Sequence, residues 1–189
     1  MECWDLVFDS YQETTAQYDL EEKNLIKPTA PADKRGDAKT MSKPEPTFKI
    51  RPARLHDQKI VRTLLSGFKL PLDGLEETRL WVLQSSNGEV VGVAGLEVYD
   101  NQGLLRSVAV VKSMHNRGYG TFLANYVIGE AKKSQVQDLF LLTTTTPAFF
   151  KKLGFKEESR EKVAGSITNS VEFKSACPKT AILMRLSKA

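Results

Sequence analysis

The feature that most constrains this chain is an apolar strand that leads through a glycine-containing turn into a helix. The segment reads SVAVVKSMHNRGYGTFLANYVI, residues 107–128. Its first residues predict a buried strand ending at Val111, and apolar residues at helical spacing predict a helix from about Gly118 to Lys133. The first amides of a helix have no partner inside it, and the helix dipole is positive there. This arrangement therefore favours an anion such as a phosphate.

The glycines of this turn are a weak signal alone, because glycine before a helix is commonly a plain turn. Asn116 tolerates positive φ better than most residues, and His115 and Arg117 add hydrogen-bond donors. A Walker loop requires G-x-x-x-x-G-K and a dinucleotide fold requires G-x-G-x-x-G, and neither is present here. The segment therefore predicts a phosphate-binding turn of another kind, with a plain turn as the alternative.

The rest of the chain from Phe48 onward alternates between strand and helix patterns. Two β-rich runs within 79–100 flank Asn87-Gly88, a dipeptide typical of hairpin turns. Further strands are expected over 48–53, 104–111, 136–144, 154–159 and 181–186, and helices over 57–65, 118–133 and 147–153, with another short helix before Phe173. The order predicts an α/β fold in which helices flank one mixed, mainly antiparallel sheet.

The first 47 residues differ from the remainder in charge and composition. Residues 1–25 contain seven acidic side chains and one lysine, and residues 27–46 are rich in proline and lysine without apolar periodicity. We predict an acidic segment and flexible linker over 1–47, and one domain over 48–189. Met41 also resembles an ordinary start, so residues 1–40 are interpreted as a dispensable extension or a docking tag.

Composition excludes several classes of protein. No apolar run approaches the roughly 20 residues of a membrane span, and the acidic N-terminus is unlike a secretory signal. Two cysteines cannot form a disulfide framework or a four-ligand zinc site, so we expect a cytoplasmic protein without a metal. Residues 48–189 carry an excess of eight basic side chains, but these are scattered. We expect an anionic small molecule rather than nucleic acid or a membrane as the partner.

HNRGYG at 115–120 resembles the Q/R-x-x-G-x-G/A loop of GNAT (Gcn5-related) N-acetyltransferases, and LGF at 153–155 resembles their closing motif. The resemblance covers about residues 48–189 and implies an enzyme that uses acetyl-CoA. It implies that amides of the loop bind the diphosphate, and that Val108, Ala109 and Val110 pair with the thioester and pantetheine. The loop residues concerned are His115, Asn116, Arg117, Gly118, Tyr119, Gly120 and Thr121. His115 departs from the family, which usually has Gln or Arg there.

A second departure concerns the proton for the leaving thiolate. Many of these enzymes supply it from a tyrosine before the closing motif, where this chain has Phe150, which the resemblance places beside the cofactor. A thiol of pKa near 8.5 leaves tolerably as an anion. Solvent or a hydroxyl of the run 143–146, with Thr144 as the candidate, is therefore expected to suffice.

Glu97 and Arg106 are the candidates for the acceptor side of the reaction. If Tyr99 opposes Leu104 across the turn, Glu97 opposes Arg106 on one face of a hairpin. Arg106 would then bind an anionic substrate head, and Glu97 would hold or deprotonate its amine. The alternative is a cross-strand ion pair that only stabilises the sheet.

Three stretches narrow the resemblance further, namely 94–110, 139–155 and 171–186. They resemble small GNAT proteins of arsenic-resistance operons and, more distantly, amino-acid N-acetyltransferases of the N-acetylglutamate synthase type. This implies acetylation of a small acidic amino acid, or of an arsenical analogue, by direct attack in a ternary complex. A non-catalytic acyl-CoA-binding regulator and a protein or peptide acetyltransferase are the alternatives, and a homodimer is left open.

Overall fold

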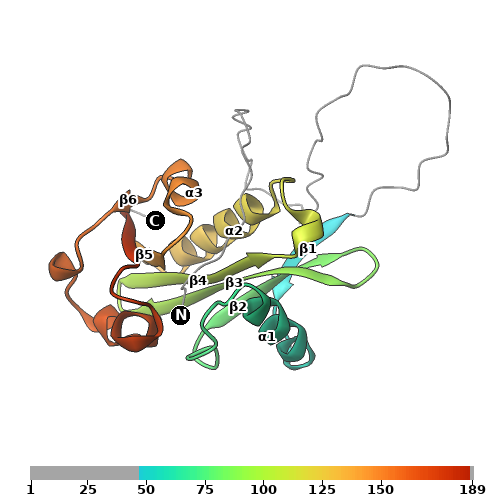
Figure 1. The fold of residues 1–189 in the computed structure, drawn as a ribbon, viewed down its shortest axis with the longest axis horizontal. Helices are drawn as coiled ribbons and strands as arrows, with labels where there is room; N and C mark the ends of the chain where they lie inside the picture. The colour runs from blue at the N-terminus through green and yellow to red at the C-terminus, as the bar shows by residue number, and fades with distance from the viewer. Residues whose placement is uncertain (1–46, 188–189) are drawn as a thin grey trace, which may run out of the picture.

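The structure is a computed structural model that describes residues 47–187 of the chain (Figure 1). It contains one seven-stranded sheet of order β1-β2-β3-β4-β5-β7-β6, antiparallel except between β4 and β5. The expectations for residues 1–46 lie outside the described residues. The predicted α/β class, with helices flanking a mainly antiparallel sheet, is confirmed.

The elements follow the predicted order. The strands are β1 (Phe48–Pro52), β2 (Arg79–Ser85), β3 (Val90–Tyr99), β4 (Gln102–Val110), β5 (Asp138–Thr143), β6 (Lys156–Glu157) and β7 (Ile182–Ser187). The helices are α1 (Gln58–Gly67), α2 (Tyr119–Lys133) and α3 (Pro147–Lys152). Short 3-10 turns are η1 (Leu55–Asp57), η2 (Lys112–Met114), η3 (Arg160–Lys162) and η4 (Ser166–Asn169), and η5 (Glu172–Ala176) is a π-type turn.

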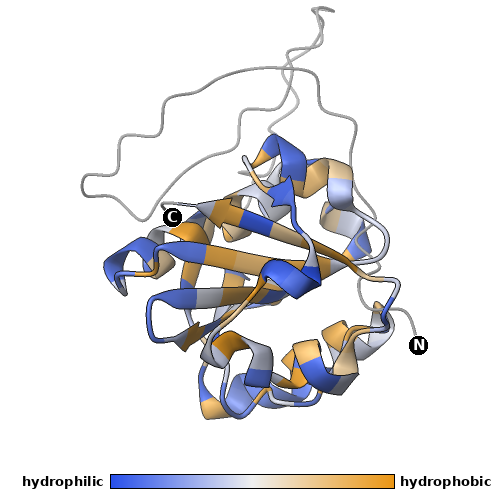
Figure 2. Cartoon of the chain, turned by 90° about the vertical axis from the view of Figure 1, so that its left-hand side faces the viewer, coloured by the Kyte–Doolittle hydropathy of each residue, from blue (hydrophilic) through white to orange (hydrophobic). Residues whose placement is uncertain are grey.

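Helices α1 and α2 cover opposite faces of the sheet (Figure 1). A Cβ added to Gly92 would lie 2.8 Å from the Leu123 side chain of α2, so this residue of β3 faces α2. Side chains alternate along a strand, so Gly95 and Glu97 face the other side. Apolar residues concentrate within the strands and hydrophilic ones at their ends and connecting turns (Figure 2). On the face of the sheet turned away from α2, Glu97 of β3 meets Arg106 of β4.

The only parallel pair among the described strands opens before it ends. Strands β4 and β5 pair over three residues each, Gln102 to Leu104 with Asp138 to Phe140. Beyond this point β4 continues to Val110, while β5 pairs only with β7 up to Thr143. Among the described strands, none therefore lies beside the β5-side edge of β4 where it leads to the glycine turn.

The β3–β4 hairpin differs from the predicted register. Tyr99 opposes Gln102, Glu97 opposes Leu104, and Arg106 opposes Gly95. The prediction that Glu97 opposes Arg106 was wrong, because the turn is only two residues long and Asp100 adopts positive φ within it. Further along β4, Ser107 also has positive φ where the register shifts, as expected of a bulge.

Candidate active site

The turn between β4 and α2 has the backbone of an anion-binding loop. Asn116 (φ 65°) and Gly118 (φ 77°) are left-handed, and the residues between β4 and α2 are largely exposed. The expectation that Asn116 tolerates this conformation is confirmed. A Cβ on Gly118 would meet nothing within 4 Å, so this point of the loop opens to free space. Alternating backbone conformations of this kind make a concave nest of amides.

Four amides at the end of this loop and the start of α2 have no acceptor within the part of the chain that the structure describes. The first main-chain bond of α2 runs from the Phe122 amide to the Gly118 oxygen, at 2.9 Å. No described residue accepts from the amides of Arg117, Gly118, Gly120 or Thr121, and Gly118 has no side-chain cap. Unpaired amides at the positive end of a 15-residue helix fit a diphosphate.

His115 also makes contacts within the protein that the sequence did not predict. Its Nε2 donates to the main-chain oxygen of Val110 at 2.7 Å. Its ring stacks on Phe68, with the ring centroids 5.8 Å apart. Its amide bonds to the oxygen of Lys112 at 3.2 Å. Nε2 and the amide are therefore already used to hold the loop against the end of β4.

The end of β4 presents main-chain groups to the opening beside β5. The Val111 amide donates to the oxygen of Val91 in β3 at 2.8 Å. Successive residues of a strand point their main-chain groups to opposite sides, so those of Val110 point away from β3. The contact of His115 with the Val110 oxygen agrees with this direction. The side chains of Val108, Ala109 and Val110 are buried, which leaves the backbone as the part available to a ligand.

The predicted residues Thr144 and Phe150 lie after β5 and within α3, respectively. Phe150 is completely buried and its ring meets Phe149 and Phe155, so it forms part of the core. Thr144 follows β5 directly, and its Oγ1 atom is buried without a hydrogen-bond partner among the described residues. Buried hydroxyls rarely lack a partner. Thr144 follows the end of β5 that is no longer paired with β4.

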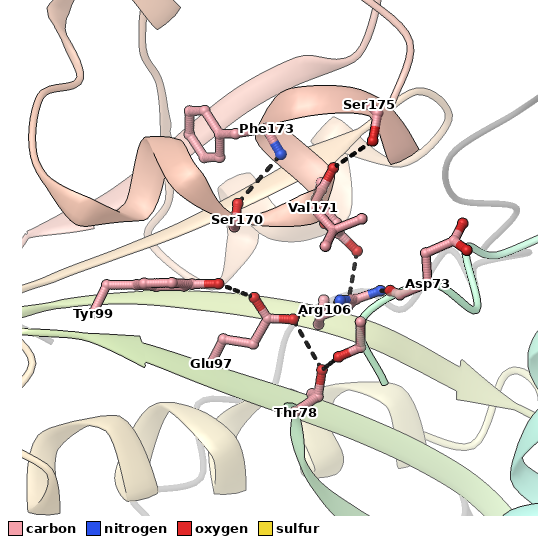
Figure 3. A network of polar contacts seen from close by, with 11 residues as sticks. Asp73, Thr78, Glu97, Tyr99, Arg106, Ser170, Val171, Phe173 and Ser175 are labelled. Carbon is pink, nitrogen blue, oxygen red and sulfur yellow. Dashed lines mark hydrogen bonds and ion pairs between the residues drawn. The ribbon is translucent and has the colours of Figure 1, made fainter. Parts of the chain in front are cut away.

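Arg106 is the centre of a buried polar network on the face turned away from α2 (Figure 3). Its side chain is completely buried, and its Nη1 lies 2.5 Å from Glu97 Oε1. Nη2 donates to the main-chain oxygen of Asp73 at 2.7 Å, and Nε lies 3.0 Å from Glu172 Oε1. The prediction that Glu97 and Arg106 meet on one face is confirmed, although they are diagonal rather than directly opposed.

Glu97 is firmly held within this network. Its Oε1 also accepts from the hydroxyl of Thr78 at 2.9 Å, and its Oε2 accepts from the hydroxyl of Tyr99 at 2.6 Å. Burial and the Glu97 carboxylate raise the pKa of Tyr99, so this hydroxyl keeps its proton. Both oxygens of Glu97 are therefore occupied, and Tyr99, which donates to Oε2, is itself half-buried.

Glu172 was missed by the sequence analysis. It lies in η5, and both of its carboxylate oxygens lack a well-aligned hydrogen bond, although Oε1 is within ion-pair distance of Arg106. Burial raises the pKa of Glu172 to about 7, with Arg106 opposing the shift and Glu97 adding to it. The one local sign of its burial in the sequence is its position between the apolar residues Val171 and Phe173.

Comparisons with known proteins agree with this geometry. Residues 76–157 match the family described as "Acetyltransferase (GNAT) domain". The chain is 26% identical to an uncharacterized N-acetyltransferase of Chlorobaculum tepidum over 150 residues, which cover 72% of this chain and 96% of the relative.

Solved structures share the fold. The protein Rv2747 of Mycobacterium tuberculosis, solved with CoA, is 25% identical with a TM-score of 0.62, over 73% of this chain and 98% of that one. N-acetylglutamate synthase of Neisseria gonorrhoeae, solved with coenzyme A and N-acetyl-glutamate, is 20% identical with a TM-score of 0.64. That match covers 75% of this chain, which spans only 35% of the synthase.

The fold and the matched region define the class of protein: residues 76–157 match a GNAT acetyltransferase domain, and the chain is an acetyl-CoA-dependent N-acetyltransferase. Residues 76–157 run from the loop before β2 to β6 and so include β4, the glycine turn and α2. Within residues 47–187, no group of three or more side chains suited to a metal is found. Nor does this part of the chain contain a helix long and apolar enough to cross a membrane.

Proposed function

We propose that this enzyme transfers acetyl from acetyl-CoA to the amino group of a small, anionic amino acid by direct attack in a ternary complex. The observation that carries the proposal is the position of Arg106, a buried cation on the face turned away from α2. An arginine there matches the charge of an acidic head group. The synthase from Neisseria gonorrhoeae, which has the same fold, was solved with N-acetyl-glutamate.

The donor half of this proposal rests on the loop and the edge of β4. Arg117, Gly118, Tyr119, Gly120 and Thr121 would bind the diphosphate, together with Asn116. The main chain of Val108 and the amide of Val110 would pair with pantetheine, with Ala109 between them, where β4 has no described strand beside it. His115 would act by orienting the loop, and Phe150 by packing beneath the opening.

The acceptor half concerns proton transfer. An amine must lose a proton to attack a thioester, and the thiolate that leaves must be stabilised or protonated. We propose that Glu97 receives the amine proton at Oε2, directly or through the hydroxyl of Tyr99, which lies 2.6 Å away. In the second case Tyr99 takes one proton and gives one to Glu97, so the number of protons is unchanged.

A panel of amines tests the acceptor class. Release of free thiol would be measured with glutamate, its phosphorus and arsenic analogues, methionine sulfone and polyamines. We expect turnover with the acidic amino acids and none with the polyamines, because a polyamine has no acid group for Arg106 to bind. Preference for the arsenical analogue would support a role in arsenic resistance. Turnover with polyamines alone would contradict the proposal.

The first alternative is a non-catalytic regulator that binds acyl-CoA. It is favoured by Phe150, which stands where a general-acid tyrosine is expected. This alternative predicts calorimetric binding of acetyl-CoA without thiol release on any amine. The second alternative, a protein or peptide acetyltransferase, predicts turnover on peptide amines but not on free amino acids.

The hydroxyl of Thr144 offers a direct test of thiolate protonation. We expect Thr144→Val to lower kcat about tenfold while leaving the melting temperature unchanged or slightly raised. The reason is that valine removes a proton donor for the reaction but also removes a buried hydroxyl without a partner. Thr168→Val, on the β6–β7 connection, is the control and should keep kcat. An unchanged kcat in Thr144→Val would leave solvent as the proton source.

A further inference from the structure

The β6–β7 connection, residues 158–181, closes over Arg106 from one side. It contains only the short turns η3, η4 and η5. On the other side of Arg106 lies the α1–β2 loop, residues 68–78, which supplies the oxygen of Asp73. A Cβ added to Gly74 of this loop would lie 3.1 Å from Arg106 Nη1 and 3.3 Å from Val171, so the two segments meet over the guanidinium.

The first half of this connection bonds to the β3–β4 hairpin, and Glu172 in the second half pairs with Arg106 on β4. Ser166 donates to Asp100 at 2.6 Å, and Gln102 donates to the oxygen of Ala164 at 3.0 Å, both at the tip of the β3–β4 hairpin. Among the described residues, the hydrogen bonds of residues 170–175 stay within the connection. The polar contact of these residues with the sheet is the ion pair of Glu172 with Arg106.

Arg106 has three partners, and they differ in how easily they can be replaced. The oxygen of Asp73 is main chain, and Glu97 is held by two further hydroxyls. Glu172 alone has both oxygens without a well-aligned hydrogen bond and is completely buried. A buried carboxylate without aligned hydrogen bonds costs folding free energy. The position that Glu172 occupies on Arg106 is therefore the one that another acid group can take.

We propose that Glu172 occupies, in the absence of acceptor, the position on Arg106 that the acid group of the acceptor takes, and so sets the affinity for acidic acceptors. This inference rests on the proposed function. Exchange of one carboxylate for another leaves the charge around Arg106 unchanged, whereas a third carboxylate beside Glu97 and Glu172 would meet repulsion. The π-type turn that carries Glu172 is of a kind often found at functional sites.

The test compares Glu172→Gln with Glu161→Gln, an exposed carboxylate on the same connection that undergoes the same change of charge. The acceptors are glutamate and glutamine, which differ in the side-chain acid group. We expect Glu172→Gln to lower KM for glutamate at least tenfold, to change KM for glutamine much less, and to keep kcat within about twofold. Glu161→Gln should behave as the unmodified enzyme.

Two results would overturn the inference. An unchanged KM for glutamate would show that Glu172 does not compete for Arg106. A loss of kcat with unchanged KM would show that Glu172 takes part in the chemical step instead. The proposed function fails separately, in the unmodified enzyme, if that enzyme acetylates neither glutamate nor its analogues; the inference then falls with it.

A binding measurement on the unmodified enzyme makes the test independent of how the variant folds. The probe is N-acetylglutamate, which has no free amine, titrated calorimetrically at pH 6 and pH 8. Protonated Glu172 no longer competes for Arg106, and its pKa is about 7, so we expect Kd to be at least threefold lower at pH 6. Equal Kd values would contradict the inference. The charged groups that act on Glu172 are Arg106 on β4 and Glu97 on β3. The elements packed against them also carry Tyr99 on β3, Asp73, Glu76 and Glu77 on the α1–β2 loop, and Lys174 on η5.

Discussion

Replacing Gly118 by valine should raise Kd for coenzyme A more than 100-fold while leaving the protein folded. Gly118 has φ 77°, a conformation that a β-branched residue strongly disfavours. Its missing Cβ points into open space at the amide nest, where the diphosphate would lie. A valine there would both distort the loop and fill the space that the phosphates need. Calorimetric titration with coenzyme A measures the effect.

Gly88 provides a matched control in the β2–β3 turn. It has φ 91°, and an added Cβ there also meets nothing within 4 Å. Both valine variants should lose about 1–3 kcal/mol of stability from the strained backbone. Only Gly118→Val should lose coenzyme A, and Gly88→Val should bind it within about threefold of the unmodified protein. Equal affinities in the two variants would show that the loop is a plain turn.

Replacing Arg106 by methionine should lower the free energy of unfolding by about 3–5 kcal/mol. The reason is that Glu97 and Glu172 would remain buried without the cation that lies 2.5 and 3.0 Å from them. Urea unfolding measures this loss. Arg185→Met is the control, because Arg185 also pairs with two acids, Asp138 and Glu158, but is half-exposed. It should lose less than about 1 kcal/mol.

The same experiment shows how strongly Glu172 depends on Arg106. Adding Glu172→Gln to Arg106→Met should restore part of the lost stability, since one of the two uncompensated carboxylates is then removed. In the unmodified background the same change should be neutral or stabilising, because Glu172 is buried with incomplete hydrogen bonding. Identical effects of Glu172→Gln in both backgrounds would mean that the two residues are not coupled.

The order of elements could be predicted from the sequence because each element has a local signal. The apolar spacing after Gly118 predicted α2, and Asn87-Gly88 predicted the β2–β3 turn, as the structure confirms. The positive φ of Asn116 was also predictable, since few residues other than glycine adopt it readily. These features depend on neighbours in the chain, which a sequence displays directly.

The acceptor site could be predicted only in part, because its geometry depends on contacts between distant segments. The register of β3 and β4 followed from a two-residue turn that was expected to be longer. The contact of Glu97 with Arg106 survived this error, because residues diagonal across two strands are still within reach of long side chains. Glu172 joins Arg106 from an irregular connection with no periodicity, so no sequence pattern placed it there.

Amide hydrogen exchange at Arg117, Gly118, Gly120 and Thr121 tests the central claim, that these amides bind the diphosphate of acetyl-CoA. The amides have no acceptor among the described residues, so they should exchange rapidly in the free protein. Saturating coenzyme A should slow their exchange at least tenfold, while the amide of Gly88 is unaffected. Exchange that stays equally rapid, under conditions where calorimetry shows coenzyme A to be bound, would contradict the account.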